Sequence, residues 1–281
     1  MDTASFSEPD RSGQRPRIRS RSRHRPRAWR ILPYVIGLYL CPAPVLPAAA
    51  EQASRESGTV IRVTDGDTVT IRFADRVERR VRLIGVDAPE VDDPREDVAF
   101  HAFLSTRFSF HHLYLREVRL TYDFSPQDEY GRVLAYVWLG EGELFNELVI
   151  REGFAAAFLK YPYRKDYQEW FRGAEAQARK EKRGFWRRDA PAIIPASEVR
   201  SQMGRLISVR FRCARFSRKK AFLYLESEDG FFEAVVPGDR RRFFPDLETC
   251  AGKEITVTGF LEEFRGRSQV LLAFPRQLRL T

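Results

Sequence analysis

Three short blocks in the first half of the chain carry residue types that suit phosphodiester cleavage. They are Asp65-Gly66-Asp67-Thr68, Arg82 to Glu90, and Tyr130-Gly131-Arg132. Carboxylate oxygens can hold a hard divalent cation, a further carboxylate can orient or deprotonate a water molecule, and guanidinium groups stabilise the charge of the transition state. The four acids and two arginines therefore predict a metal-assisted phosphoryl site.

Each block alone also has a purely structural interpretation. Asp-Gly-Asp-Thr is a common turn sequence, because glycine adopts positive φ and aspartate bonds its own backbone. Ala88-Pro89 is typical of a strand end, since proline favours an extended conformation in the residue before it. An EF-hand loop starting at Asp65 is excluded, because its twelfth position, which requires glutamate, is Arg76. The order and spacing of the three blocks together favour a functional site.

The blocks resemble the thermonuclease family, the calcium-dependent staphylococcal-nuclease-like enzymes, over roughly residues 58 to 188. Further segments follow the family's order: Leu134-Ala135-Tyr136, Phe145 to Val149, Gly153, Ala174 to Ala178, and Gly184-Phe185-Trp186. The segment from Val91 to Phe103 departs from the family pattern in its short loop and in the start of its helix. The resemblance implies an OB-like barrel with appended helices.

The resemblance also implies calcium as the cofactor and a set of ligands for it. The carboxylates of Asp67 and Asp87 and the backbone carbonyl of Ala88 are expected to bind the metal. Asp65 is expected to orient metal-bound water from outside the ligand set. Hard oxygen ligands also suit magnesium and manganese, so the choice of calcium depends on the family alone.

Three further side chains are implied to be catalytic. Arg82 and Arg132 correspond to a phosphate clamp, and Glu90 corresponds to the candidate general base or water-orienting group. Tyr161 and Tyr163 are weaker candidates for stacking on the substrate or contacting its phosphate. Because all six charged side chains are present, we predict an active enzyme.

The first 50 residues have the organisation of a signal peptide. Nine arginines precede residue 31, an apolar run extends from Ile31 to Val45, and Ala48-Ala49-Ala50 offers a cleavage site. The run is shorter than the roughly twenty residues of a membrane span, so cleavage near Ala50 is favoured over an uncleaved anchor. The sequence therefore predicts a secreted or periplasmic protein, with a membrane-anchored form as the alternative.

Composition and patterning divide the rest of the chain into two domains. The predicted organisation is a signal peptide at 1–50, a linker at 51–57, a thermonuclease-like domain at 58–190, a linker at 191–199 and an OB-fold-like domain at 200–281. Helices are expected at roughly 95–112, 143–152 and 164–183. The fold class is mainly β with α: an OB-like five-stranded barrel with three helices, followed by a second small OB-like barrel.

The second domain resembles nucleic-acid-binding OB-folds more loosely, through Gly252 to Gly259 and Ala273-Phe274-Pro275. Residues 196–281 hold 16 Lys and Arg against 11 Asp and Glu, and several of these cations alternate with phenylalanine. Such a pattern can supply phosphate contacts and stacking surfaces. It is equally typical of a phenylalanine core with a solvated basic rim.

Cys213 and Cys250 are the two cysteines outside the predicted leader. In an exported protein they could form one disulfide, or they could remain as two buried thiols. Neither has a histidine or cysteine at the spacing of a zinc site.

These observations predict a calcium-dependent nuclease that acts on DNA, RNA or both with low sequence specificity. The alternative is a non-catalytic protein that binds nucleic acid through two OB-like barrels. A third interpretation assigns the second domain to the recruitment of a protein or cell-wall partner.

Overall fold

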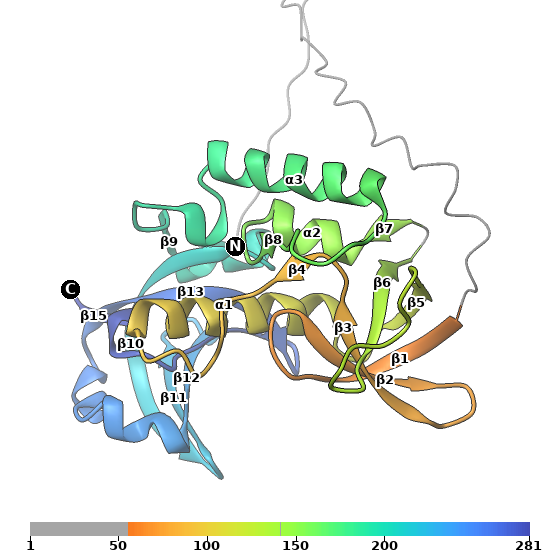
Figure 1. Ribbon diagram of the computed structural model, residues 1–281. Helices are drawn as coiled ribbons and strands as arrows, with labels where there is room; N and C mark the ends of the chain where they lie inside the picture. The colour runs from red at the N-terminus through yellow and green to blue at the C-terminus, as the bar shows by residue number, and fades with distance from the viewer. Residues whose placement is uncertain (1–55, 141) are drawn as a thin grey trace, which may run out of the picture. The chain divides into compact units, whose positions relative to one another are not determined.

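The computed structural model describes residues 56–140 and 142–281 (Figure 1). The predicted signal peptide and nearly all of the predicted 51–57 linker lie outside these residues. Within the described ranges, no helix combines the length and apolar character that a membrane span needs.

The first half forms a closed five-stranded barrel. Its strands are β1 (Glu56–Val63), β2 (Thr68–Phe73), β3 (Glu78–Leu83), β5 (Glu117–Thr121) and β6 (Val133–Leu139). β1 pairs with β2 and β5, β2 with β3, and β5 with β6, all antiparallel, and a parallel β3–β6 pairing closes the barrel. β7 (Glu143–Leu144) extends the sheet, and β4 (Val86–Asp87) pairs with β8 (Ala156–Ala157).

β2 and β3 show the alternation of half-buried strands. Val69, Ile71 and Phe73 on β2 and Val81 and Leu83 on β3 are all buried. The residues that lie between these positions are more exposed, as the two-residue period of a strand requires.

Three helices pack on this barrel, close to the predicted ranges. They are α1 (Glu96–Leu113), α2 (Phe145–Arg151) and α3 (Lys165–Lys180). Asn146, fully buried on α2, accepts from Val137 N at 2.8 Å and donates to Ile84 O at 2.9 Å. Its amide thereby joins the helix to the β3 and β6 ends beside the predicted site.

The second half repeats the same strand topology. Its strands are β10 (Leu206–Lys219), β11 (Phe222–Ser227), β12 (Phe232–Pro237), β13 (Glu254–Phe264) and β14 (Arg267–Leu271). β10 pairs with β11 and β13, β11 with β12, and β13 with β14, and a parallel β12–β14 pairing closes the barrel. The mainly β fold with two small barrels is confirmed.

The 3-10 helix η2 (Gly184–Trp186) follows α3 and belongs with the first barrel, because Phe185 N–H donates to Gly153 O at 2.9 Å. Other short elements accompany the second barrel: β9 (Ile193–Pro195), β15 (Leu278–Leu280) and the 3-10 helices η3 (Ala196–Gln202), η4 (Gly238–Phe243), η5 (Leu247–Cys250) and η6 (Pro275–Gln277). β9 falls in the segment predicted as the 191–199 linker, yet it pairs in parallel with β10. The backbone of this segment is therefore part of the second sheet.

Helix α1 contacts both barrels (Figure 1). The rings of Phe108 and Phe260, the latter on β13, lie 5.8 Å apart between centroids. Arg107 forms an ion pair with Glu262 on the same strand, and both side chains are largely buried. Phe260 thus belongs to the core around the first barrel.

Both cysteines of the second barrel are buried free thiols, so the disulfide alternative does not describe this structure. Burial and the neighbouring Cys250 raise the pKa of Cys213 to about 11. Because the thiolate is the form that reacts, this environment keeps Cys213 protonated and unreactive.

Candidate active site

The acidic turn Asp65-Gly66-Asp67 connects β1 to β2 at one end of the first barrel. Asp65 stabilises the turn, because its Oδ1 accepts the backbone N–H of Asp67 at 3.0 Å. The carbonyl of Asp67 accepts the N–H of Leu83 at 2.9 Å, which ties the turn to the end of β3. The local turn chemistry and the β2–β3 register therefore place Asp67 beside the Arg82 to Glu90 block.

Asp67 is the centre of this arrangement and is only 6% exposed. Its Oδ2 accepts the N–H of Ala88 at 2.8 Å and lies 2.6 Å from the Arg82 guanidinium, while its Oδ1 accepts the Thr68 hydroxyl. The hydrogen bond to Ala88 brings the carboxylate next to Asp87. Two of the three predicted blocks are thus joined through one side chain.

The charges in this region favour a bound cation. Burial, opposed by Arg82 and reinforced by Asp65, raises the pKa of Asp67 to about 7. Burial also raises the pKa of Asp87, with Arg82 opposing and Glu175 reinforcing the rise. Several carboxylates share one guanidinium here, so negative charge is in excess.

The donor set fits calcium as an oxygen-rich site of few protein ligands. In the described part of the chain, no three acidic, histidine or cysteine side chains converge as a metal cluster. A cation held by Asp67 and Asp87 would therefore complete its shell with the Ala88 carbonyl and water, which calcium accepts.

The Arg82 guanidinium is placed to bind an anion. Its Nη1 forms an ion pair with Asp67 Oδ2 at 2.6 Å, so the acidic turn fixes the position of the guanidinium. A planar guanidinium held in this way can offer further N–H donors to an anion such as a phosphate.

Arg132 stands at the start of β6, which pairs with β3 through Val81–Val133 and Arg82–Leu134. Arg132 is two residues before the partner of Arg82, so the strand period puts both arginines on the same face. The Arg132 Nε donates to Asp128 Oδ2 at 2.7 Å. Asp128 thus fixes Arg132 within its own turn, and the β3–β6 pairing puts this turn at the strand next to Arg82.

Glu90 and Tyr161, two further residues predicted for the site, are both exposed. Glu90 is exposed in the loop after β4 and makes no side-chain contact in the described chain. Tyr161 is 59% exposed, with the ammonium of Lys160 5.6 Å from its ring centroid, so it can meet a ligand.

The stacking role suggested for Tyr163 is wrong for this structure. Tyr163 is 6% exposed, and burial raises the pKa of its phenol to about 12. The hydroxyl is buried near Gly85, where an added Cβ would lie 2.8 Å from it. The ring is core, because the short Tyr-Pro-Tyr segment turns its second tyrosine inward.

Two positions that the sequence analysis left without a role support the site. Glu175 on α3 accepts the N–H of Ala157 at 3.0 Å, on the strand that pairs with Asp87. Ser109 on α1 donates to the carbonyl of Gly66 at 2.7 Å. Glu175 lies in a segment that resembles the family, whereas nothing in the local sequence marks Ser109.

Gly66 lets the acidic turn approach α1 closely. An added Cβ would lie 1.9 Å from Ser105 Oγ and 2.7 Å from Ala88 Cβ. We expect Gly66→Ala to displace the turn, lower the melting temperature and reduce nucleic-acid hydrolysis by at least about tenfold.

The matched control for this prediction is Gly173→Ala on α3, where an added Cβ meets nothing within 4 Å. Because alanine favours a helix over glycine, this variant should be at least as stable as the wild type. Full activity and stability in Gly66→Ala would show that the turn does not depend on this contact.

Comparison with known proteins places the first barrel in a recognisable group. Residues 80–188 match the family described as "Staphylococcal nuclease homologue". The chain is 41% identical over 143 residues to a thermonuclease of Staphylococcus hyicus, covering 51% of this chain and 83% of that protein. It is 44% identical over 133 residues to a thermonuclease of Staphylococcus intermedius, covering 47% and 77%.

A less similar relative is also named as a nuclease. Over 164 residues the chain is 26% identical to the endonuclease YhcR of Bacillus subtilis (strain 168), covering 56% of this chain and 13% of that protein. The family match ends at residue 188, before the second barrel begins.

Proposed function

The chain belongs to the thermonuclease family of staphylococcal nuclease homologues, and from this premise we propose that it is a calcium-dependent nuclease acting on DNA, RNA or both. Family membership establishes a phosphodiesterase; the metal, the substrate and the residue roles are our proposal. The observation that carries it is the buried Asp67 carboxylate, which contacts Arg82 and Ala88 together.

Asp67, Asp87 and the carbonyl of Ala88 would hold the calcium. When bound, calcium would supply positive charge that stabilises the negative charge on the phosphate oxygens in the transition state. Arg82, whose guanidinium is oriented by Asp67, binds a non-bridging phosphate oxygen through its remaining N–H groups.

The reaction itself is a displacement at phosphorus. A water oxygen forms a bond to phosphorus while the bond to one ester oxygen breaks, and the water proton passes to a carboxylate. We assign that acceptor role to Glu90, whose exposure leaves it free to meet water and substrate. Arg132 stabilises the charge on the phosphate and the departing oxygen.

Low sequence specificity follows from what these residues contact. The proposed groups address metal and phosphate, and phosphates carry no sequence information. We also propose that the protein is exported, secreted or periplasmic, from the basic, apolar and alanine-rich order of residues 1–50.

Hydrolysis of single- and double-stranded DNA and RNA, with calcium and with chelator, tests the proposal. We expect degradation that requires calcium and that cleaves at sites without a common sequence. Retention of nucleic acid in a gel shift without hydrolysis under saturating calcium would support a binding protein instead. Equal degradation with chelator would contradict the metal.

A further inference from the structure

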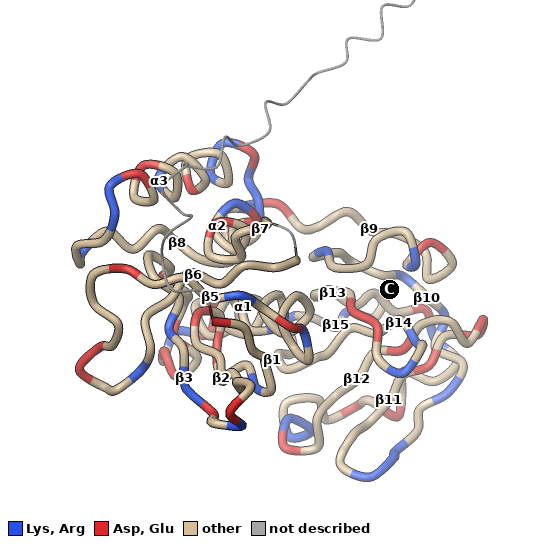
Figure 2. Tube along the Cα trace, turned by 90° about the vertical axis from the view of Figure 1, so that its right-hand side faces the viewer, with Lys and Arg blue, Asp and Glu red and all other residues tan. Residues whose placement is uncertain are grey.

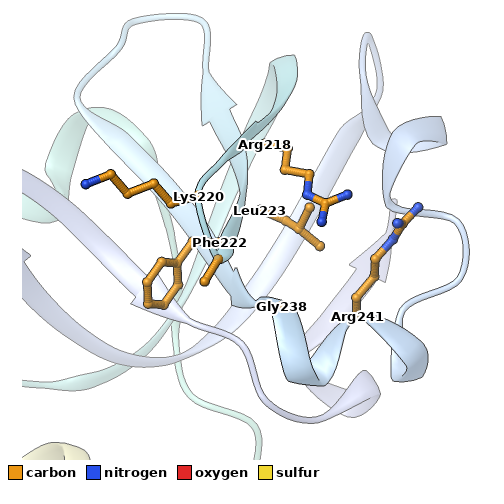
Figure 3. Close-up of a pocket in the computed structure, with 7 residues that line it drawn as sticks. Arg218, Lys220, Phe222, Leu223, Gly238 and Arg241 are labelled. Carbon is orange, nitrogen blue, oxygen red and sulfur yellow. The ribbon is translucent and has the colours of Figure 1, made fainter.

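The second barrel has a basic pocket at the tip of its first hairpin. Six of the residues that line it are Arg218, Lys220, Phe222, Leu223, Gly238 and Arg241 (Figure 3). The hairpin connects β10 to β11, and its tip carries the run Arg218-Lys219-Lys220, which colours the tube blue below the β11 label (Figure 2). Three of the lining side chains are therefore cationic.

The pocket occupies the position that the acidic turn has in the first barrel. The two barrels share one strand topology, and in each the turn in question joins the first strand to the second. This turn holds Asp65 and Asp67 in the first barrel, whereas in the second barrel Lys219 ends β10 and Lys220 lies in the turn. The same place in the fold is thus acidic in one barrel and basic in the other.

The cations of the hairpin differ in whether an acid neutralises them. Arg215 and Lys219 both reach Glu226, at 2.6 Å and 3.3 Å. Burial raises the pKa of the Glu226 carboxyl. Hydrogen bonds from Arg215, Ser217 and Lys219 outweigh burial and lower this pKa to about 2. In the described ranges, Arg218 and Lys220 have no acidic partner, so their charge is available to a ligand, whereas Arg241 forms an exposed ion pair with Glu248 at 3.1 Å that a phosphate would have to replace.

The backbone around the pocket is fixed. Gly238 donates to Ala221 O at 2.7 Å, which attaches η4 to the hairpin, and an added Cβ would lie 2.8 Å from that oxygen. Arg218 faces Leu223 across the β10–β11 pair, and Leu223 is buried in the second core. Arg218 thus lies on a paired strand, and Arg241 lies on a 3-10 helix that is hydrogen-bonded to the hairpin.

Aromatic rings lie next to these cations. Phe222, at the start of β11, is 41% exposed, and Phe243, at the end of η4, is 39% exposed. The guanidinium of Arg242 sits 4.7 Å from the Phe243 ring centroid. Bases of a single strand can stack on exposed rings, whereas bases inside a duplex keep their faces on one another.

We propose that this pocket binds single-stranded nucleic acid, with Arg218, Lys220 and Arg241 on the phosphates and Phe222 under a base. The nature of the occupant rests on the proposed nuclease function, because its substrate is the polyanion that the unpaired charges of Arg218 and Lys220 attract. The pocket is built from the loop between strands one and two of the barrel, the start of strand two and η4, and that loop is one of the elements with which OB-folds bind oligonucleotides.

The test measures binding without hydrolysis, so that it does not depend on nuclease activity. The full chain is titrated, in chelator, against a labelled single strand of about 12 nucleotides with hydrolysis-resistant linkages. We expect Arg218→Gln, Lys220→Gln and Arg241→Gln together to raise the Kd at least about tenfold. The dependence of log Kd on log salt should fall by about 2, for three lost phosphate contacts.

The matched control removes three exposed arginines of the same barrel that do not line the pocket, by Arg205→Gln, Arg212→Gln and Arg279→Gln. Its Kd should change about twofold or less, although the net charge lost is the same. Phe222→Ala should weaken binding about fivefold or more and leave the salt dependence unchanged.

Three results would overturn the proposal. They are equal weakening by the two triple variants, undiminished binding in Phe222→Ala, and a duplex of the same sequence bound as tightly as the single strand. All substituted side chains are exposed, so each variant is first checked for a melting temperature near that of the wild type. Loss of hydrolysis with intact binding would fail the proposed function and leave this inference standing.

Discussion

Asp67→Asn is expected to reduce calcium-dependent hydrolysis by at least about 100-fold while the protein remains folded. The amide oxygen can still accept the N–H of Ala88, and the amide nitrogen can donate to the Thr68 hydroxyl, so the turn keeps its local bonds. What is lost is the negative charge that faces Arg82 and that we propose as a calcium ligand. A loss of that size is about 3 kcal/mol of transition-state stabilisation.

The same substitution should stabilise the metal-free protein above neutral pH. The folded-state pKa of Asp67, about 7, lies above its ordinary value of 3.8, so the folded protein binds the extra proton between these values. Stability is therefore lost as pH rises from about 4 to about 7. In chelator at pH 8, we expect Asp67→Asn to melt at least about 2 °C above the wild type.

The control is Asp75→Asn, another turn aspartate of this barrel whose carboxylate accepts a backbone N–H, from Val77 at 2.9 Å. It should keep its activity and show no such gain at pH 8. Calcium should raise the melting temperature of the wild type and of Asp75→Asn, but not of Asp67→Asn. Normal hydrolysis by Asp67→Asn would remove Asp67 from the site.

Arg132→Ala is the second substitution with a large expected effect, a fall in kcat of at least about 100-fold. Its guanidinium is held by Asp128 and shares a sheet face with Arg82, so its removal takes away a fixed positive charge at the phosphate. The ion pair with Asp128 is partly buried, with side chains 23% and 17% exposed, so its loss should lower the melting temperature by a few degrees and leave the protein folded.

Arg72→Ala is the control, because Arg72 also forms an ion pair on the same barrel, with Glu78 at 2.8 Å, but a more exposed one. Its kcat should stay near the wild-type value. Arg132→Lys, which keeps the charge but not the planar fork, should recover only part of the rate. Equal kinetics for Arg132→Ala and Arg72→Ala would show that Arg132 does not act on the substrate.

The two barrels and the acidic centre were predictable because their signals are local. The turn residues from Asp65 to Thr68 and the alternation along β2 and β3 can be recognised from neighbouring residues in the sequence. Together they place Asp67 beside Arg82. The resemblance supplied the order of the blocks. The end of α2 could be read for the same reason, since Gly153 takes positive φ two residues after Arg151, whereas α3 ends at Lys180, three residues before the end that Gly184 suggested.

Contacts between distant segments could not be predicted in this way. Ser109 meets the Gly66 carbonyl, and Asn146 bonds β3 and β6, only because α1 and α2 dock where they do. Tyr163 looks like an exposed binding residue in sequence, but the docking of α3 buries it. The pairing of β9 with β10 likewise joins a proline-rich segment to a sheet through a register that no local pattern specifies.

Helix α1 touches the acidic turn through Ser109 and the second barrel through Phe108 and Arg107. Removing the second barrel would expose the ring of Phe108 to water and leave the buried charge of Arg107 without its partner, both at a cost in stability. The two barrels are therefore expected to unfold in one cooperative transition. A shortened chain that loses activity would report on the folding of the first barrel as much as on substrate binding by the second, so point substitutions are the sounder probe of each.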